Sequence, residues 1–319
     1  MPRKPIMLLV FLLFLCPTVW GAKYAGEFLS LGVGGRALGM GGAFVAVCDD
    51  ASAGYWNPAG LQKLGQKQLI FMHAETFGSL LNHDYLAYVL PLGNEDGSSS
   101  LSLGLMRLGG GGIKLTSLEK DGPISDSNRV VFVRETGHAD YTLLLSYSRK
   151  SRPNLAWGAS SKIIYRKLAD NSAFGMGLDC GILFSPYGFL AFGANLMDLT
   201  ATFLSYDNGT TESIYPSLKI GMAARKDFNG FSNVFEIDSD VRFEGRRSSA
   251  QYWTGNASFD MHYGFESWYG KRIAGRLGFD QGDLTAGIGL RVRQFIIDAA
   301  YLSHDQLDNS YRISLQVKL

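Results

Sequence analysis

A run of carboxylates in the second half of the chain has residue types and a spacing that could do chemistry. Glu236, Asp238 and Asp240 alternate with other residues, so an extended strand would carry all three on one face. Such a face could hold an acid pair for proton transfer or oxygen ligands for calcium. In a β-barrel the same run is a solvated wall of the lumen, balanced by Arg276 and Arg291, and we favour this alternative.

Other motifs with chemical associations lack their structural context. Gly32, Gly34 and Ala37 match the dinucleotide fingerprint GxGxxG/A, but no βαβ unit follows them. Ser117 to Lys120 match SxxK without the accessory motifs of penicillin-binding enzymes. The five histidines are scattered and show no ligand spacing. We therefore expect neither an enzyme nor a bound metal or cofactor.

The composition narrows the class of protein further. Among 319 residues, 30 Lys and Arg face 29 Asp and Glu, and this balance argues against a nucleic-acid partner. A hydrophobic share of 46% argues against disorder. Cys16, Cys48 and Cys180 lack any CxxC spacing and are interpreted as small apolar residues. A disulfide between Cys48 and Cys180 stays open as an alternative in an exported protein.

The N-terminus has the order of an export signal. Arg3 and Lys4 precede an apolar run over 6–15, and small residues end the stretch at Gly21 and Ala22, where we expect cleavage. The run is too short for a membrane span, which needs about 20 residues. No later apolar run reaches that length, so a mature membrane protein would have to be a barrel. The predicted location is the bacterial outer membrane.

From residue 67 onward, apolar and polar residues alternate in segments of about ten, the signature of transmembrane β-strands. The clearest hairpin joins 284–292 to 295–302, where pairing Val292 with Phe295 puts the large apolar residues on one face. The pattern predicts an all-β, transmembrane barrel of about fourteen antiparallel strands. The predicted strands lie near 67–76, 83–91, 99–108, 139–149, 154–167, 173–185, 189–197, 216–227, 231–241, 257–268, 271–280, 284–293, 295–302 and 310–319.

Charged residues keep to the other face of these segments. An arginine on the lipid face would cost roughly 2 to 4 kcal/mol at the bilayer midplane, so the charged face is assigned to the lumen. A hairpin turn near 168–172 would place Lys162 opposite Asp179 as an inward ion pair. The predicted lumen charges are Lys162, Arg166, Asp179, Glu236, Asp238, Glu266, Arg276, Arg291 and Asp298.

The connections support the strand count, because they alternate in length. Every second connection is short, and the other set contains the long ones, over 109–138, 198–215 and 242–256. Barrels of this kind have short periplasmic turns and longer external loops. The long connections are therefore predicted to be external.

Residues 34–61, GGRALGMGGAFVAVCDDASAGYWNPAGL, do not alternate. Asn57 and Pro58 within them fit a helix N-cap followed by proline at the first helical position. The stretch resembles the N-terminal motif of the PorV/PorQ family, within the FadL-like outer-membrane barrels. The resemblance implies a fourteen-stranded barrel with an N-terminal hatch, or plug, folded into its lumen. The expected division is a signal peptide over 1–22, the hatch over 23–66 and the barrel over 67–319.

The resemblance also suggests what the protein does. FadL-like barrels imply passive transport or binding of hydrophobic small molecules, whereas PorV-like members imply type IX secretion, in which the external loops bind the C-terminal domains of secreted cargo. A purely structural barrel is a third alternative. A continuous apolar lumen would favour transport, and exposed apolar loop tips would favour secretion.

The expected partners are outer-membrane lipid, the ligand or the cargo, and the barrel assembly machinery, although the chain ends in Leu319 rather than the phenylalanine usual in that machinery's signal. Apolar hatch residues either contact a ligand or only pack the plug. The predicted hatch and ligand residues are Leu38, Gly39, Met40, Gly41, Gly42, Phe44, Val45, Asn57 and Pro58.

Overall fold

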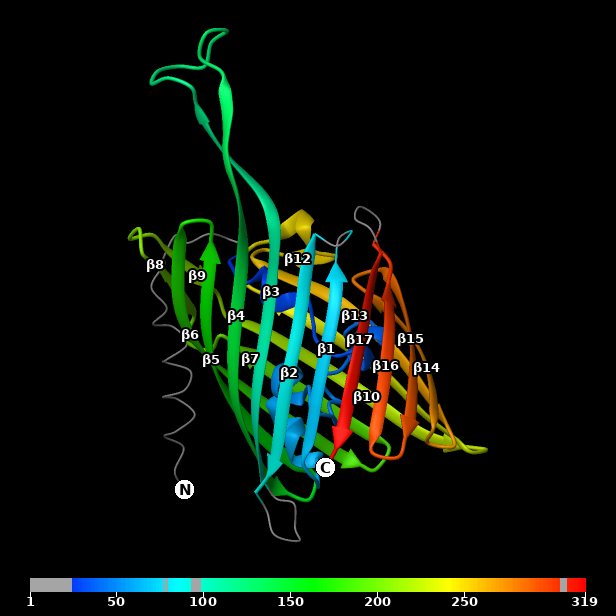
Figure 1. The fold of residues 1–319 in the computed structure, drawn as a ribbon. Helices are drawn as coiled ribbons and strands as arrows, with labels where there is room; N and C mark the ends of the chain where they lie inside the picture. The colour runs from blue at the N-terminus through cyan, green and yellow to red at the C-terminus, as the bar shows by residue number, and fades with distance from the viewer. Residues whose placement is uncertain (1–24, 77, 79, 93–98, 305–308) are drawn as a thin grey trace, which may run out of the picture.

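The computed structural model describes residues 25–319 except 77, 79, 93–98 and 305–308, and its strands close into a barrel (Figure 1). Seventeen strands are connected, and β8, β9 and β12 are side branches, which leaves fourteen in the closed ring of the described chain. Each ring strand runs antiparallel to both neighbours, and β17 closes the ring on β1. The ring consists of β1 (Gln68–Thr76), β2 (Leu81–Pro91), β3 (Ser99–Leu118), β4 (Val130–Arg152), β5 (Leu155–Leu168), β6 (Asn171–Tyr187), β7 (Leu190–Met197), β10 (Ser217–Phe228), β11 (Phe231–Arg242), β13 (Ala257–Tyr269), β14 (Ile273–Asp280), β15 (Asp283–Val292), β16 (Phe295–Leu302) and β17 (Ser310–Lys318).

The fourteen predicted strands are confirmed. Val292 pairs with Phe295 across the predicted two-residue turn. Large apolar side chains alternate outward along the wall, for example Leu277 and Phe279 on β14, which are 56% and 48% exposed. No helix among the described residues is long and apolar enough to cross a membrane. The predicted signal peptide lies outside the described residues.

The predicted opposition of Lys162 and Asp179 is wrong by two residues. The turn after β5 is tighter than expected, because Leu168 pairs with Asn171, and Lys162 therefore lies opposite Gly177. The ion pair nevertheless forms along the diagonal, with 2.9 Å between Lys162 Nζ and Asp179 Oδ1. A lysine side chain reaches a diagonal neighbour easily.

On the described outer surface, a charged group departs from the predicted alternation. His73 on β1, Asp84 on β2 and Arg107 on β3 lie side by side on the outside, since Asp84 pairs with both neighbours. The distances are 2.7 Å from His73 Nδ1 to Asp84 Oδ1 and 2.9 Å from Arg107 Nη1 to Asp84 Oδ2. These are the three strands whose alternation is least regular.

The predicted long connection over 109–138 is mostly strand. β3 and β4 continue past the rest of the barrel as a two-stranded ribbon, which rises at the upper end of Figure 1. Apart from two register shifts, the pairing runs on to Leu118 and Val130. Valine and phenylalanine at 130–133 have high strand propensity, so the ribbon pairs with itself.

The other two long connections also contain structure. β8 (Thr202–Tyr206) and β9 (Thr211–Ile214) form a hairpin that pairs with β6, and β12 (Tyr252–Thr254) pairs with β13 next to the short helix η3 (Arg247–Ser249). The short connections gather at the opposite, lower end, together with the C-terminus (Figure 1).

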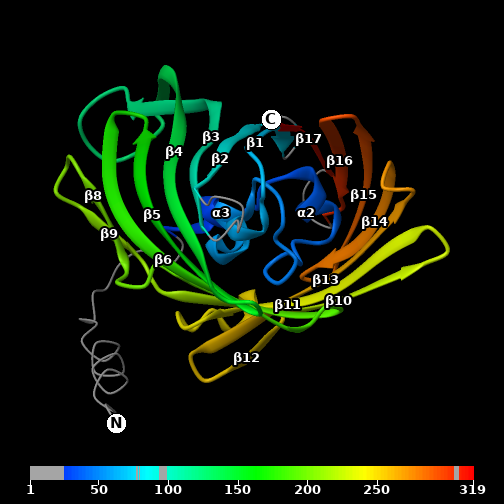
Figure 2. The same cartoon turned by 90° about the horizontal axis from the view of Figure 1, so that it is seen from below.

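Residues 25–66, here called the lumenal segment, lie inside the ring of strands (Figure 2). They form four short helices, η1 (Glu27–Ser30), α2 (Gly35–Gly39), α3 (Ala53–Trp56) and η2 (Pro58–Lys63), joined by irregular backbone. Helix α2 contacts β14 to β17, and η2 contacts β3 to β6 on the opposite side of the lumen. The segment therefore bridges the barrel interior.

We predict that the ribbon contributes nothing to barrel stability. Deleting 113–136 joins Gly112 to Gly137 above the paired residues Gly110 and His138, and three glycines then close the turn. The midpoint temperature of thermal unfolding in detergent should shift by less than about 2 °C. For a domain of this size, that shift corresponds to a change of less than about 1 kcal/mol in the free energy of unfolding. A larger loss of stability would show that the ribbon supports the wall.

Candidate functional site

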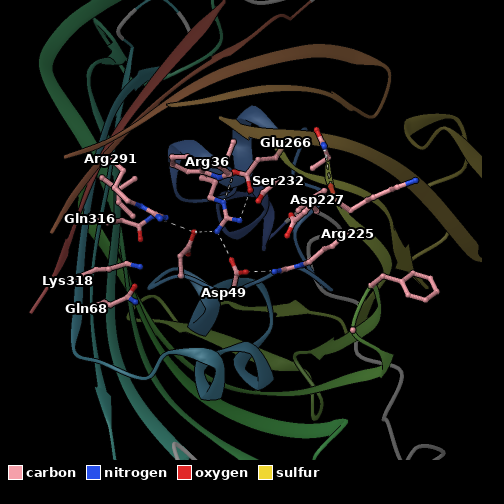
Figure 3. A pocket seen from close by; sticks show the side chains of 18 residues that line it. Arg36, Asp49, Gln68, Arg225, Asp227, Ser232, Glu266, Arg291, Gln316 and Lys318 are labelled. Atoms are coloured by element: carbon pink, nitrogen blue, oxygen red, sulfur yellow. Dashed lines mark hydrogen bonds and ion pairs between the residues drawn. The ribbon is translucent and has the colours of Figure 1, made fainter. Parts of the chain in front are cut away.

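A charged network connects the lumenal segment to the wall at its centre (Figure 3). The guanidinium of Arg36 on α2 donates to Glu266 of β13, with Nε to Oε2 at 2.8 Å and Nη2 to Oε1 at 2.7 Å. Glu266 also accepts from Arg276, whose Nη1 lies 2.9 Å from Asp298 Oδ1. These wall side chains are almost fully buried, so the paired charges lie out of water.

Asp49 extends this network toward the lower end. Its Oδ1 accepts from Arg36 at 2.6 Å and its Oδ2 accepts from Arg225 of β10 at 2.7 Å. Burial by itself raises the pKa of Asp49, but the charges of Arg36 and Arg225 outweigh burial and hold this pKa well below its usual range. Asp49 is therefore ionised at neutral pH and connects two arginines.

Two of the three carboxylates on the inward face of β11 bind backbone, and the third, Asp240, pairs with Lys219 of β10. Asp238 Oδ2 accepts from the amides of Phe44 and Val45 at 2.7 and 2.9 Å. Glu236 accepts from the next two amides of the segment, at 2.5 Å from Ala46 N and 3.1 Å from Val47 N. Among the described residues, no group of three His, Cys, Asp or Glu side chains could hold a metal ion.

The carbonyls of the same loop are also bound. Lys63 Nζ donates to the carbonyls of Ala46 and Val47 at 3.2 and 2.8 Å. Asn57 Nδ2 donates to Val45 O at 3.0 Å and to Ile182 O of β6 at 3.1 Å. Burial lowers the pKa of Lys63. Because carboxylates bind its amides, and Lys63 and Asn57 bind its carbonyls, loop 44–47 is held from both sides.

The predicted N-cap is confirmed, although the helix that follows is a 3₁₀ helix. Asn57 Oδ1 accepts from Ala59 N at 3.1 Å and Pro58 occupies the first turn. Gly60 packs against the buried Cys48. Cys48 and Cys180 are both free thiols, so the alternative of a disulfide between them is not realised.

Inward-facing glycines of the wall allow the segment to approach the strands. A Cβ added at Gly193 of β7 would lie 2.3 Å from Val45 O, which is too close for any side chain. A Cβ added at four other wall glycines would overlap residues 40–41 or 57–58 of the segment in the same way. The wall glycines concerned are Gly158, Gly181, Gly193, Gly264 and Gly278.

The apolar residues predicted for ligand contact lie in the packed core. Leu38, Met40, Phe44 and Val45 are at most 2% exposed, and none lines either cavity described below. Met40 and Phe44 pack in one cluster with Trp56. Gly39, Gly41 and Gly42 are buried against the wall. In this conformation the segment has to move before these side chains can contact a ligand.

The polar cavity, of about 490 Å³, lies between the segment and the lower end of the barrel (Figure 3). Arg36, Asp49 and Arg225 line it, together with Gln68, Gln316 and Lys318 from β1 and β17. Arg291 also lines it, but instead of balancing the β11 carboxylates its guanidinium lies 4.8 Å from the ring centroid of Trp268. The sequence did not reveal this stacking.

The remaining predicted lumen charges lie higher in the barrel. Arg166 Nε donates to Asp140 at 2.7 Å, and its Nη2 donates to Ala25 O of the segment at 3.2 Å. Lys162 pairs with Asp198 as well as Asp179, each at 2.9 Å. All nine predicted lumen charges therefore point inward, in several separate groups.

The amphipathic cavity, of about 470 Å³, lies at the upper end. Its apolar lining comes from η1, from the residue that follows η1 and from three wall strands, β2, β3 and β16, and its polar lining includes Thr285, Ser310 and Arg312. The apolar residues are Phe28, Leu31, Leu81, Leu108 and Leu302. The segment contributes lining to both cavities, Arg36 and Asp49 to the polar one and Phe28 and Leu31 to the amphipathic one.

Comparison with known proteins gives one sequence match and several structural matches. A family model described as "Uncharacterised protein family (UPF0164)" matches residues 20–103, which is less than half of the chain. No curated protein sequence matches significantly. The PorV/PorQ resemblance has no counterpart in these matches and stays a prediction.

The structural matches cover almost the whole barrel. The CymD monoaromatic hydrocarbon channel superposes with a TM-score of 0.60 and 13% identity, covering 91% of this chain and 98% of that one. The Pseudomonas putida toluene transporter TodX gives 0.55 and 14%, covering 90% and 97%. A Pseudomonas aeruginosa FadL homologue gives 0.53 and 13%, covering 89% and 97%. The chain therefore has the fold of FadL-like outer-membrane channels.

We predict that Arg36 is needed to hold the segment in the lumen. Arg36→Gln leaves the buried Glu266 with one cation fewer and should lower the free energy of unfolding by about 3 kcal/mol. Equilibrium unfolding by guanidinium in lipid vesicles measures this change. The control is Arg134→Gln on the ribbon, which breaks an exposed pair with Asp170 in the turn between β5 and β6 and should have no measurable effect. Equal unfolding midpoints for the two variants would contradict the prediction.

We also predict that the wall glycines are a docking surface for the segment. Gly193→Ala should lower the unfolding free energy by about 1 to 3 kcal/mol and expose the segment to trypsin at Arg36 or Lys63, because the added methyl group overlaps Val45 O. Gly275→Ala is the matched control, since a Cβ there meets nothing within 4 Å. If both variants resist trypsin like the parent protein, the docking role is refuted.

Proposed function

We propose that the protein is an outer-membrane channel that passively transports or binds hydrophobic small molecules, and that the lumenal segment is its hatch. One observation carries this proposal: a closed barrel has its interior filled by a segment that separates an upper cavity from a lower one. The structural relatives that are channels for monoaromatic hydrocarbons support it. The proposed function is transport or binding, and it assigns no catalytic role to any residue.

The outer surface supports the proposed location in a membrane. Large apolar side chains face outward from almost every ring strand, as a lipid-exposed wall requires. We propose that residues 1–22 direct export, that the short connections face the periplasm, and that the ribbon is external. Barrel assembly machinery would insert the chain.

Transport in this architecture needs movement of the hatch. The lumen does not offer a continuous apolar path. A polar cavity lies below the segment, and ion pairs such as Arg36–Glu266 join the segment to the wall at the centre of the lumen. A ligand that enters the upper cavity could pass only when the lumenal segment leaves its place as a unit, from α2 through loop 44–47 to α3.

Secretion is the second candidate, and one observation favours it. The ribbon exposes Val130, Phe132 and Val133 at 53% or more, and Ile124 at its tip is 74% exposed. Apolar residues on an external projection suit the docking of a protein such as the C-terminal domain of secreted cargo. Deleting 113–136 would then abolish secretion and leave small-molecule uptake unchanged.

A reversible lock on the hatch tests transport. A Cβ at Gly54 lies 3.6 Å from Ser146 Cβ of β4, within the range for a disulfide. We predict that the pair Gly54→Cys and Ser146→Cys slows uptake of radiolabelled toluene by intact cells at least tenfold when oxidised, and that a reductant restores it. Either single variant is the control.

Two outcomes would count against the proposal. Uptake equal to that of cells without the protein would refute transport. Fast uptake by the oxidised double variant would show that the segment is not a hatch.

A further inference from the structure

One row of lumen residues at the upper end contains two polar side chains without partners. Ala74 of β1 pairs with His83 of β2 on one side and with Arg312 of β17 on the other, and Arg312 pairs in turn with Ala300 of β16. All four are buried, with His83 0% and Arg312 3% exposed. The methyl groups of the flanking alanines cannot hydrogen-bond to either side chain.

Arg312 differs from the paired cations in the described lumen. Arg36, Arg276, Lys162 and Lys219 each contact a carboxylate. In the described residues, Nε and Nη1 of Arg312 and both ring nitrogens of His83 have no hydrogen-bond partner. Burying a cation without a counter-charge is costly, so the surroundings of Arg312 favour an anion.

The carboxylates that line the same cavity are engaged elsewhere. Glu27 accepts from Arg242 at 3.0 Å and from Arg246 at 2.8 Å. Asp280 lies 3.0 Å from His262 Nδ1, and Asp283 also has a partner. None of these acids neutralises Arg312.

Arg312 lines the amphipathic cavity, which has an apolar part beside its polar and acidic lining. Its apolar lining includes Leu108, the strand partner of His83, together with Phe28, Leu31, Leu81 and Leu302. A volume of about 470 Å³ is the size of a small-molecule site. The cavity thus combines a compact apolar wall with one buried, unpaired cation.

We propose that the amphipathic cavity binds a compact organic anion, with an acidic head group on Arg312 and an apolar body against Phe28, Leu31, Leu108 and Leu302. The planar guanidinium of Arg312 can hold a carboxylate through two parallel hydrogen bonds. This inference deepens the proposed function, on which it rests, because it names the class of ligand. A neutral hydrocarbon would leave Arg312 unsatisfied.

The test uses three ligands that share one apolar body. Binding of 4-butylbenzoate, 4-butylbenzyl alcohol and butylbenzene to the purified full chain in mild detergent is measured by isothermal titration calorimetry. We expect the benzoate to bind at least tenfold more tightly than either neutral compound. Arg312→Gln should weaken benzoate binding at least tenfold and change binding of the alcohol less than twofold. Arg149→Gln, on the outer face of β4, is the matched control and should leave all three affinities unchanged.

A second variant covers the case in which Arg312→Gln does not fold. Ala74→Leu puts a larger apolar side chain next to Arg312, its strand neighbour, and should abolish binding of the benzoate while the barrel still migrates as a heat-modifiable band. Equal affinity for benzoate and alcohol, or full benzoate binding by either folded variant, would overturn the inference. Toluene uptake that still responds to the disulfide lock would then show that the channel stands without this ligand class.

Discussion

The structure depends on one constraint: the irregular backbone inside a closed barrel needs hydrogen-bond partners that bulk water cannot supply there. Loop 44–47 has no partner strand, and its amides are bound instead by the carboxylates of Glu236 and Asp238. Its carbonyls are bound by Lys63 and Asn57. What looks like a catalytic acid pair in the sequence is therefore a surface that holds the segment by its backbone.

The same constraint explains the distribution of charge. Each acid that approaches the segment is balanced either by backbone amides, which carry partial positive charge, or by an arginine such as Arg36 or Arg276. Glycines on the facing strands let these groups approach closely enough. At the centre of the lumen, most charged side chains pair with one another. Among the described residues, Arg312 at the upper end is an exception, and we connect Arg312 with ligand binding.

The sequence predicted the wall well because the requirement on the wall is local. A residue that faces the outside must be apolar, its neighbours must not be, and this period of two is visible without knowing which strands pair. The hairpin at Val292 and Phe295 was therefore predicted to the residue. The ribbon was missed because its strands leave the barrel and face water on both sides, so the alternation that marks a wall is lost there.

The interior could be predicted only in part, because its contacts join residues far apart in the chain. The parity of the strands placed the nine lumen charges, but the partners of Glu236 and Asp238 lie about 190 residues away, in a segment without periodicity. Nothing in the sequence marks Gly193 as a docking position rather than a weak point in a strand, or Ala74 as a spacer between two polar side chains.

The arrangement also limits how the lumen can open. The segment is fixed most strongly between α2 and η2, where buried ion pairs and bound amides hold it to opposite sides of the wall. Breaking these contacts one at a time leaves buried charges unpaired at every step, whereas moving the segment together with water into the lumen re-solvates all of them. Opening is therefore expected to be a concerted, hydrated transition, and the polar cavity below the segment, which already borders Arg36, Asp49 and Arg225, is where water would enter first.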